Sequence, residues 1–162
     1  MTIRSLAAPL ALAVSLVAGQ AAAADLVLTM TGGGNVTSGQ QRTFTINTGS
    51  VLLGLPPGLV VEVKLSSAAT GFTASSISGA GWTCSNQTFS CTRTTGIAPG
   101  GTFPPITVTG AAGQAPGSYT MCFVISHQTN AAVQPDQVAS NNSACVRGNI
   151  RRGPRDGRDP QS

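Results

Sequence analysis

The chain has 162 residues, only 9% of them charged, and a formal net charge of +4 at pH 7. In residues 25–150 the charges nearly balance, and the rest of the positive excess lies in the two ends. A nearly neutral globular part carries no basic face of the kind that nucleic-acid binding requires, so we exclude nucleic acid as a partner. The charged residues of 25–150 are Arg42, Lys64, Arg93 and Arg147 against Asp25, Glu62 and Asp136.

Residues 1–24 predict a secretory signal peptide. Arg4 precedes an apolar segment from Leu6 to Ala18, and a run of Ala residues ends at Ala24, which predicts cleavage between Ala24 and Asp25. The apolar run is interrupted by Pro9 and is shorter than the roughly 20 residues that span a bilayer. We therefore expect an exported protein with no stable membrane insertion after cleavage.

The remaining chain predicts one all-β domain over residues 25–150. Thr, Ser, Gly and Val dominate it, whereas Lys, Asp and Glu are scarce. Thr and Val favour strands, and Gly, Pro and Asn favour turns. The first predicted strand is Asp25–Met30, followed by a Gly-rich loop over 31–40 whose glycines permit positive φ. Residues 42–48 then alternate, with Phe44 and Ile46 on the buried face.

Further alternating segments follow at short intervals. Residues 59–65 place four apolar side chains on one face and the charged Glu62 and Lys64 on the other, and a weaker strand over 71–77 has Phe72 as its anchor. Residues 78–94 predict a hairpin anchored by Trp82 and Phe89, and the alternation resumes over 106–109. Short strands separated by frequent turn signals are the pattern of a β-sandwich.

The last part of the domain runs from Gly117 to Cys145. Residues 119–125 are strongly apolar and rich in β-formers, which predicts a central strand buried on both faces. A polar loop then leads to a second strand over 143–147. Residues 151–162 contain Arg, Asp, Gly, Pro, Gln and Ser, cannot bury enough apolar surface to fold, and predict a disordered basic tail.

The chain contains four cysteines, which in a short exported chain imply two disulfides. Cys84 and Cys91 are spaced so that two facing hairpin strands can bridge them. That leaves Cys122 to pair with Cys145, which would join the central strand to the last one. A zinc site is the alternative, but no pair of these cysteines has the CxxC spacing.

Several short motifs, quoted at the end of this paragraph, resemble two bacterial families. Their order resembles the secreted repeat family known as domain of unknown function eleven, and 117–119 with 141–142 is also similar to the cell-adhesion-related domain found in bacteria. Both resemblances imply an immunoglobulin-like β-sandwich in exported or surface proteins. The motifs are LPPG (55–58), GWTC (81–84), FSCT (89–92), IAPGG (97–101) and NNSA (141–144).

The sequence predicts no catalytic site, metal site or cofactor. His127 is the only histidine, and with Ser126 and Asp136 it could be arranged as a triad, but such groups are recognised by geometry and not by proximity in sequence. Asp136, Asn141 and Asn142 could be imagined around calcium, yet they offer a single carboxylate where calcium usually has several.

Two classes of function remain. The first is a non-enzymatic structural or interaction module, adhesion-like, that binds a protein or an envelope polymer in the periplasm or at the cell surface. The second is a carbohydrate-binding module that uses Trp82 and neighbouring aromatic residues. A possible recognition surface is therefore Trp82 with Phe89: an exposed Trp82 would favour glycan binding, and a buried one would favour the first class.

Overall fold

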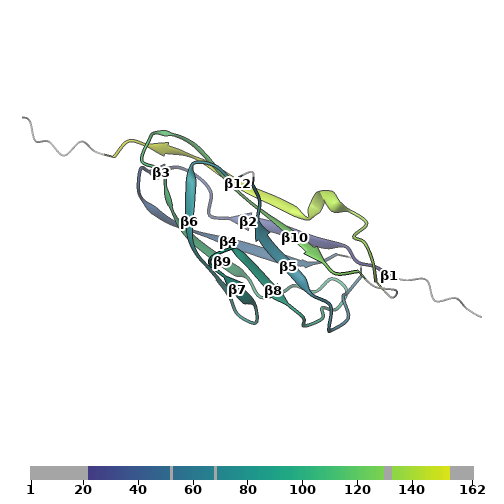
Figure 1. Cartoon of the computed structure of the whole chain (residues 1–162). Helices are drawn as coiled ribbons and strands as arrows, with labels where there is room; N and C mark the ends of the chain where they lie inside the picture. The colour runs from purple at the N-terminus through teal and green to yellow at the C-terminus, as the bar shows by residue number, and fades with distance from the viewer. Residues whose placement is uncertain (1–21, 52, 68, 130–132, 154–162) are drawn as a thin grey trace, which may run out of the picture.

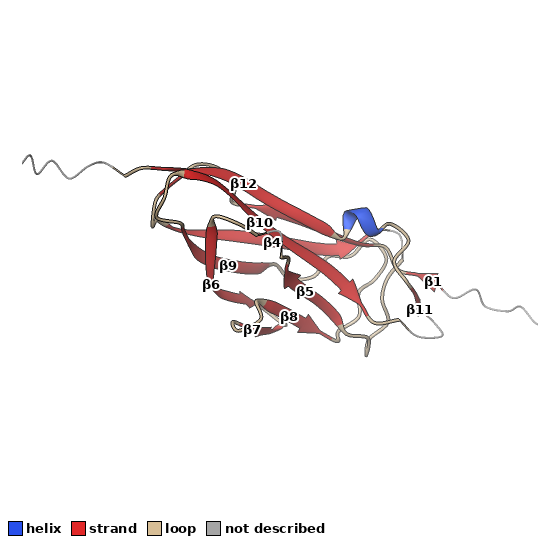
Figure 2. Ribbon diagram, turned by 45° about the horizontal axis from the view of Figure 1, so that its top comes forward, coloured by secondary structure: helices blue, strands red, loops and turns tan. Residues whose placement is uncertain are grey.

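The computed structural model describes residues 22–51, 53–67, 69–129 and 133–153. Within them two sheets pack face to face, and one turn of 3-10 helix, η1 (Ala139–Asn141), is the one helical element (Figure 2). The fold is an antiparallel immunoglobulin-like β-sandwich with two disulfides, as the sequence predicts. The predicted signal peptide lies almost entirely outside the described residues, and so does most of the predicted tail.

The smaller sheet has four strands in the order β2-β4-β9-β6. They are β2 (Leu26–Thr31), β4 (Gln41–Ser50), β9 (Ile106–Ala112) and β6 (Phe72–Gly79). All of its pairings are antiparallel, and β6 carries a bulge between Ala74 and Ser76.

The larger sheet has six strands in the order β3-β12-β10-β5-β8-β7. They are β3 (Val36–Thr37), β12 (Ser143–Arg151), β10 (Gly117–His127), β5 (Val61–Leu65), β8 (Ser90–Arg93) and β7 (Thr83–Ser85). A separate parallel pair, β1 (Ala22–Ala23) with β11 (Val133–Gln134), lies at the end of the sandwich away from β3 (Figure 1).

The strand order reproduces the immunoglobulin arrangement. Strands β2, β4, β9 and β6 stand where that fold has A, B, E and D, and β12, β10 and β5 stand where it has G, F and C. The β7–β8 hairpin extends the second sheet beyond β5. Both disulfides lie within the larger sheet, between neighbouring strands, whereas the disulfide of antibody domains joins the two sheets.

The core fills the space between the sheets. Phe44 and Ile46 of β4, Val61 and Val63 of β5 and Phe123 of β10 are all at most 1% exposed. An aromatic cluster joins the layers, because the rings of Phe44 and Phe72 from the smaller sheet lie 6.2 Å and 5.6 Å from the ring of Tyr119 in the larger one. The alternation read from residues 42–48 and 59–65 is therefore confirmed.

One expectation about the central strand is wrong. β10 is not buried on both faces, because the domain has two layers and leaves the outer face of each sheet in contact with solvent. Ser118 and Ser126 point outward and are exposed, while Cys122 is covered through its disulfide partner. The apolar run reflects the inward side chains of β10 together with this disulfide position.

The last strand is longer than the sequence suggests. β12 runs to Arg151, one residue into the predicted tail, because Ile150 is buried and pairs with both Gly117 and Val36. Gly148 lies inside this strand, and a side chain there would collide with the Gly34 carbonyl.

Candidate functional site

The hairpin that carries Trp82 and Phe89 is built as an anchor. Trp82 is 8% exposed, its ring lies 5.6 Å from that of Phe103, and its indole N–H donates to the Pro104 carbonyl over 2.9 Å. Phe89 is half-buried against the core with a positive φ of 46°. By the criterion set above, a buried Trp82 favours an interaction module over a glycan platform at this hairpin.

Arg93 completes this buried corner. Its guanidinium carbon lies 5.1 Å from the Trp82 ring and 4.6 Å from the Phe103 ring, which is cation–π geometry. Its Nε and Nη1 atoms are buried without a hydrogen-bond partner, and burial lowers the pKa of the group from its ordinary value. Arg93 stays protonated nonetheless. An inward charge near a sheet edge discourages pairing with another chain.

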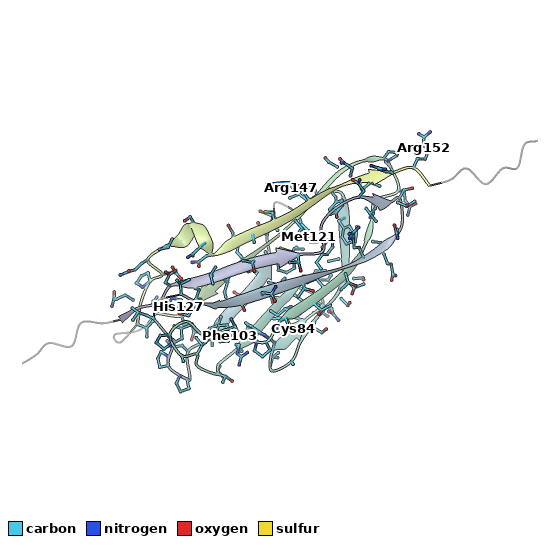
Figure 3. The ribbon with its side chains drawn as sticks, turned by 180° about the vertical axis from the view of Figure 1, so that it is seen from behind. Cys84, Phe103, Met121, His127, Arg147 and Arg152 are labelled. Carbon is cyan, nitrogen blue, oxygen red and sulfur yellow. A yellow bond between two sulfur atoms is a disulfide. The ribbon has the colours of Figure 1, made fainter. Side chains whose placement is uncertain are left out.

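His127 lies at the end of β10, towards the end of the molecule that is opposite Arg152 (Figure 3). Its Nδ1 atom is 2.7 Å from the carbonyl of Gln128, and Ser126 and Glu62 line the same shallow depression. Asp136, the third member of the imagined triad, instead accepts the backbone N–H groups of Leu26 and Val138.

Two of the three residues considered for calcium, Asp136 and Asn141, form hydrogen bonds within the domain. Asp136 bridges the start of β2 to the loop after β11, and the Asn141 amide donates to the Asp25 carboxylate over 2.8 Å. In the part of the chain that the structure describes, no group of three or more His, Cys, Asp or Glu could hold a metal ion. Within the same residues, no helix is long and apolar enough to cross a membrane.

Three of the four sheet edges are short, bulged or capped, whereas β2 forms the fourth edge with six residues. The Ile77 N–H on the edge strand β6 donates to the Asn86 side chain over 2.8 Å, and β6 is also bulged. The other sheet ends in the three-residue β7 on one side and in the two-residue β3 on the other. Short, bulged or capped edges resist pairing with an added strand.

The outer face of the four-stranded sheet is an array of small hydroxyl side chains, which we call the threonine face. One row crosses all four strands from Thr31 through Thr45 and Thr107 to Ser78, as the cross-strand pairing defines it. A second row runs from Thr43 through Thr109 to Ser76, and Thr29 pairs with Asn47. Every one of these residues is exposed or half-exposed.

This face is free of charge and of aromatic rings. Arg42, the charged residue on β4, shares the inward parity of Phe44, and its guanidinium binds the carbonyls of the Gly-rich loop at Gly32, Gly33 and Asn35 over 2.6–2.9 Å. The other residues that point outward from these strands are Val27, Gln41, Gly49, Thr73, Ser75 and Ala111. Among the described residues of the sheet, the threonine face thus offers hydroxyl, amide and methyl groups alone.

A hollow of about 240 Å³ opens at one end of the threonine face. Val27, Thr29 and Asn47 form its floor, and Gly100, Gly101 and Thr102 form a wall. That wall stands close to β4 because Gly49 has no side chain: a Cβ there would lie 2.7 Å from the Gly101 carbonyl oxygen. The loop is fixed by hydrogen bonds from Ser50 N–H to Gly101 and from Phe103 N–H to Thr48.

Sequence reasoning singled out Trp82 and missed this surface. Each strand of the smaller sheet was predicted, but the rows appear only once the cross-strand pairing is known. The one available signal was the recurrence of Thr, with Asn47, at alternate positions in 29–31, 43–47 and 107–109. It resembles any solvated strand face, because Thr favours strands everywhere.

Comparisons with known proteins show no family for this chain. No family model matches the chain, so the resemblances to domain of unknown function eleven and to the cell-adhesion-related domain remain hypotheses. No curated protein matches it either.

Solved structures do resemble it. The cell-adhesion-related (CARDB) domain of a Pyrococcus furiosus protein has 16% identity and a TM-score of 0.46, and the match covers 80% of this chain and 94% of that domain. A protein described as catalysing macrocyclization in alchivemycin A biosynthesis has 10% identity, a TM-score of 0.45 and coverage of 80% and 90%. The collagen-binding domain of a Staphylococcus aureus adhesin has 8% identity, a TM-score of 0.35 and coverage of 75% and 96%. Similarities this distant do not transfer a function.

Proposed function

We propose that this protein is an exported, non-enzymatic interaction module that binds a component of the bacterial envelope or cell surface through the threonine face. The observation that carries the proposal is an uncharged, hydroxyl-bearing surface that spans all four strands of one sheet. The hydroxyl and amide side chains of this face are exposed or half-exposed and therefore accessible to a partner. Two hydrogen bonds form within the face: the Thr43 and Thr109 hydroxyls lie 3.3 Å apart, and the Ser75 hydroxyl donates to the Thr109 carbonyl over 3.1 Å.

Export is supported by covalent structure and by sequence. Both pairs of cysteines are joined as disulfides, which persist in oxidising compartments outside the cytosol. The predicted signal peptide over residues 1–24 agrees with this. The proposed location is the periplasm or the cell surface.

A non-enzymatic role is supported by how the reactive groups are used. His127 faces a backbone carbonyl, and Asp136 is committed to two backbone N–H groups. A general base must reach the proton that it removes. Neither group is arranged with a nucleophile for that purpose.

The carbohydrate-binding alternative based on Trp82 loses its main support. A glycan site built on Trp82 needs its ring to be exposed, and the Trp82 ring packs against Phe103 and Arg93 inside the sandwich. Phe89 alone offers a half-buried ring beside the hairpin turn.

The proposal is tested by placing charge on one face at a time. Thr43 and Thr107 are exposed on the threonine face, and Ser118 and Ser126 are exposed on the outer face of the six-stranded sheet. We expect T43K/T107K to weaken binding of the full chain to isolated bacterial envelopes at least tenfold, because two lysines must be desolvated or displaced there. The matched S118K/S126K protein should bind like the wild type.

Sedimentation of labelled protein with envelope fractions measures both affinities, and circular dichroism verifies that each variant is folded. Equal binding by wild type and T43K/T107K, or a selective loss in S118K/S126K, would contradict the proposal.

A further inference from the structure

We infer that the partner of the threonine face is an uncharged polysaccharide chain, and that the hollow beside Asn47 receives one of its sugar rings. This inference rests on the proposed function, because it names the class of partner for the same face. It differs from the glycan hypothesis built on Trp82 in using hydroxyl, amide and methyl groups of the opposite sheet.

The composition of the face disfavours a protein partner of high affinity. Interface hot spots are enriched in Trp, Tyr and Arg, and interface cores in aromatic residues and Met, whereas Ser is depleted. The outward residues of β2, β4, β9 and β6 include none of the enriched types. Such a face is suited to many weak hydrogen bonds repeated along a polymer.

The absence of charge on this face narrows the polymer further. Nucleic acids and anionic lipid surfaces are bound through Lys and Arg that neutralise phosphate, and anionic polysaccharides call for the same complementarity. The basic residues of the sheets either point inward, as Arg42 and Arg93 do, or lie on the other sheet, as Lys64 and Arg147 do. A polymer whose recognition groups are hydroxyls matches the threonine face.

The hollow has the size and lining for one sugar ring. Its volume of about 240 Å³ is below the range of drug-sized pockets. Asn47 brings an amide with both donors and an acceptor, and Thr29 and Thr102 bring hydroxyls that donate and accept. Val27 supplies an apolar patch for the C–H groups of a ring, and the neighbouring Val51 is 49% exposed.

The shape of the sheet favours a single chain over a crystalline surface. Sheets twist, and a bulge increases the twist locally. The bulge between Ala74 and Ser76 lies within the strand that forms one border of the face. A flexible chain can follow a twisted array, whereas a rigid flat lattice would meet only part of it. Adjacent rows are separated by about 6.6–6.8 Å along each strand, and neighbouring residues within one row by about 4.8 Å across the strands.

The test is a titration of the ¹⁵N-labelled protein with cellohexaose, laminarihexaose and hexa-N-acetylchitohexaose, which are uncharged, and with oligogalacturonate, which is anionic. We expect at least one uncharged hexamer to shift the amide signals of Val27, Asn47 and Thr102 with a dissociation constant of about 1 mM, as fits a few weak hydrogen bonds. Oligogalacturonate should shift them at least tenfold less at equal concentration.

Two variants locate the contact. N47A should weaken binding of the active hexamer about fivefold, which corresponds to the loss of one hydrogen bond. The control T120V, on the outer face of β10, should leave it unchanged.

The inference is overturned if none of the three uncharged hexamers shifts these signals, if oligogalacturonate shifts them as strongly, or if the shifts gather around Trp82. Should envelope binding still depend on Thr43 and Thr107 while none of the uncharged hexamers competes for it, the face remains the contact surface and the partner is a different molecule.

Discussion

The two outer faces of the sandwich differ in the work that their side chains do. On the six-stranded sheet, Glu62, Lys64 and Arg147 point outward, and the Cys122–Cys145 disulfide closes over two neighbouring strands. On the four-stranded sheet the outward side chains are small and uncharged, and neither disulfide reaches it.

The comparison separates a sheet that is cross-linked by two disulfides from a sheet that has none. The six-stranded sheet holds itself together covalently within its own plane, so its outer face serves the fold. The four-stranded sheet is held by its ladders and by its inward side chains against the core. Its outer face can therefore carry a binding function without loss of stability.

The largest effect on stability is expected where the four-stranded sheet, which has no disulfide, packs against the core. Phe44 is fully buried, and its ring lies 4.9 Å from that of Phe72 and 6.2 Å from that of Tyr119. F44A should lower the free energy of unfolding by about 3–5 kcal/mol, because it leaves a cavity between the sheets. Urea unfolding followed by Trp82 fluorescence measures this, and a loss below about 1 kcal/mol would show that the smaller sheet does not depend on its core contacts.

The next largest effect on stability is expected from removing each of the two disulfides. The loop closed by Cys122–Cys145 has a sequence separation of 23, against 7 for Cys84–Cys91. Loop-closure entropy then predicts a loss of about 3.5 kcal/mol for C122S/C145S and about 2.5 kcal/mol for C84S/C91S. Thermal unfolding of both double variants ranks their losses of stability. The reverse order would mean that the disulfide of the hairpin, and not the one between β10 and β12, contributes more to the stability of the larger sheet.

A smaller effect concerns the link from the larger sheet to the Gly-rich loop. The hydroxyl of the fully buried Tyr119 donates to the Gly34 carbonyl over 2.8 Å. Y119F keeps the ring and removes this bond, so we expect a loss of about 1–2 kcal/mol. The free energies of unfolding of Y119F and of the surface control T120V, taken from denaturant titrations, should differ by that amount. Equal free energies would show that the bond contributes nothing.

Much of the fold was predictable because strand periodicity is a local property. The alternation around Phe44 and around Val61 identified two strands and their buried faces. Hairpin spacing led to the Cys84–Cys91 disulfide, which left Cys122 to pair with Cys145. The last strand was predicted to end at Arg147, but β12 continues through Gly148 to Arg151, and only the tertiary structure shows that a side chain at Gly148 would collide with Gly34.

The candidate surface was not predictable for a related reason. Trp82 attracted attention as the single tryptophan, yet its ring packs against Phe103, which lies outside the predicted hairpin 78–94, as well as against Arg93. The rows of the threonine face depend on the strand order β2-β4-β9-β6. In this order β9 lies between β4 and β6, although it follows both of them in the sequence. A pattern of Thr on one strand says nothing about its neighbours.

The most direct test of the central claim removes hydroxyl groups from the threonine face without adding charge. Thr45 and Thr107 pair across β4 and β9, and T45V/T107V preserves their shape and strand propensity. We expect its stability to stay within about 0.5 kcal/mol of the wild type, as for most surface substitutions, while envelope binding falls at least tenfold. Unchanged envelope binding by this folded variant would contradict the account.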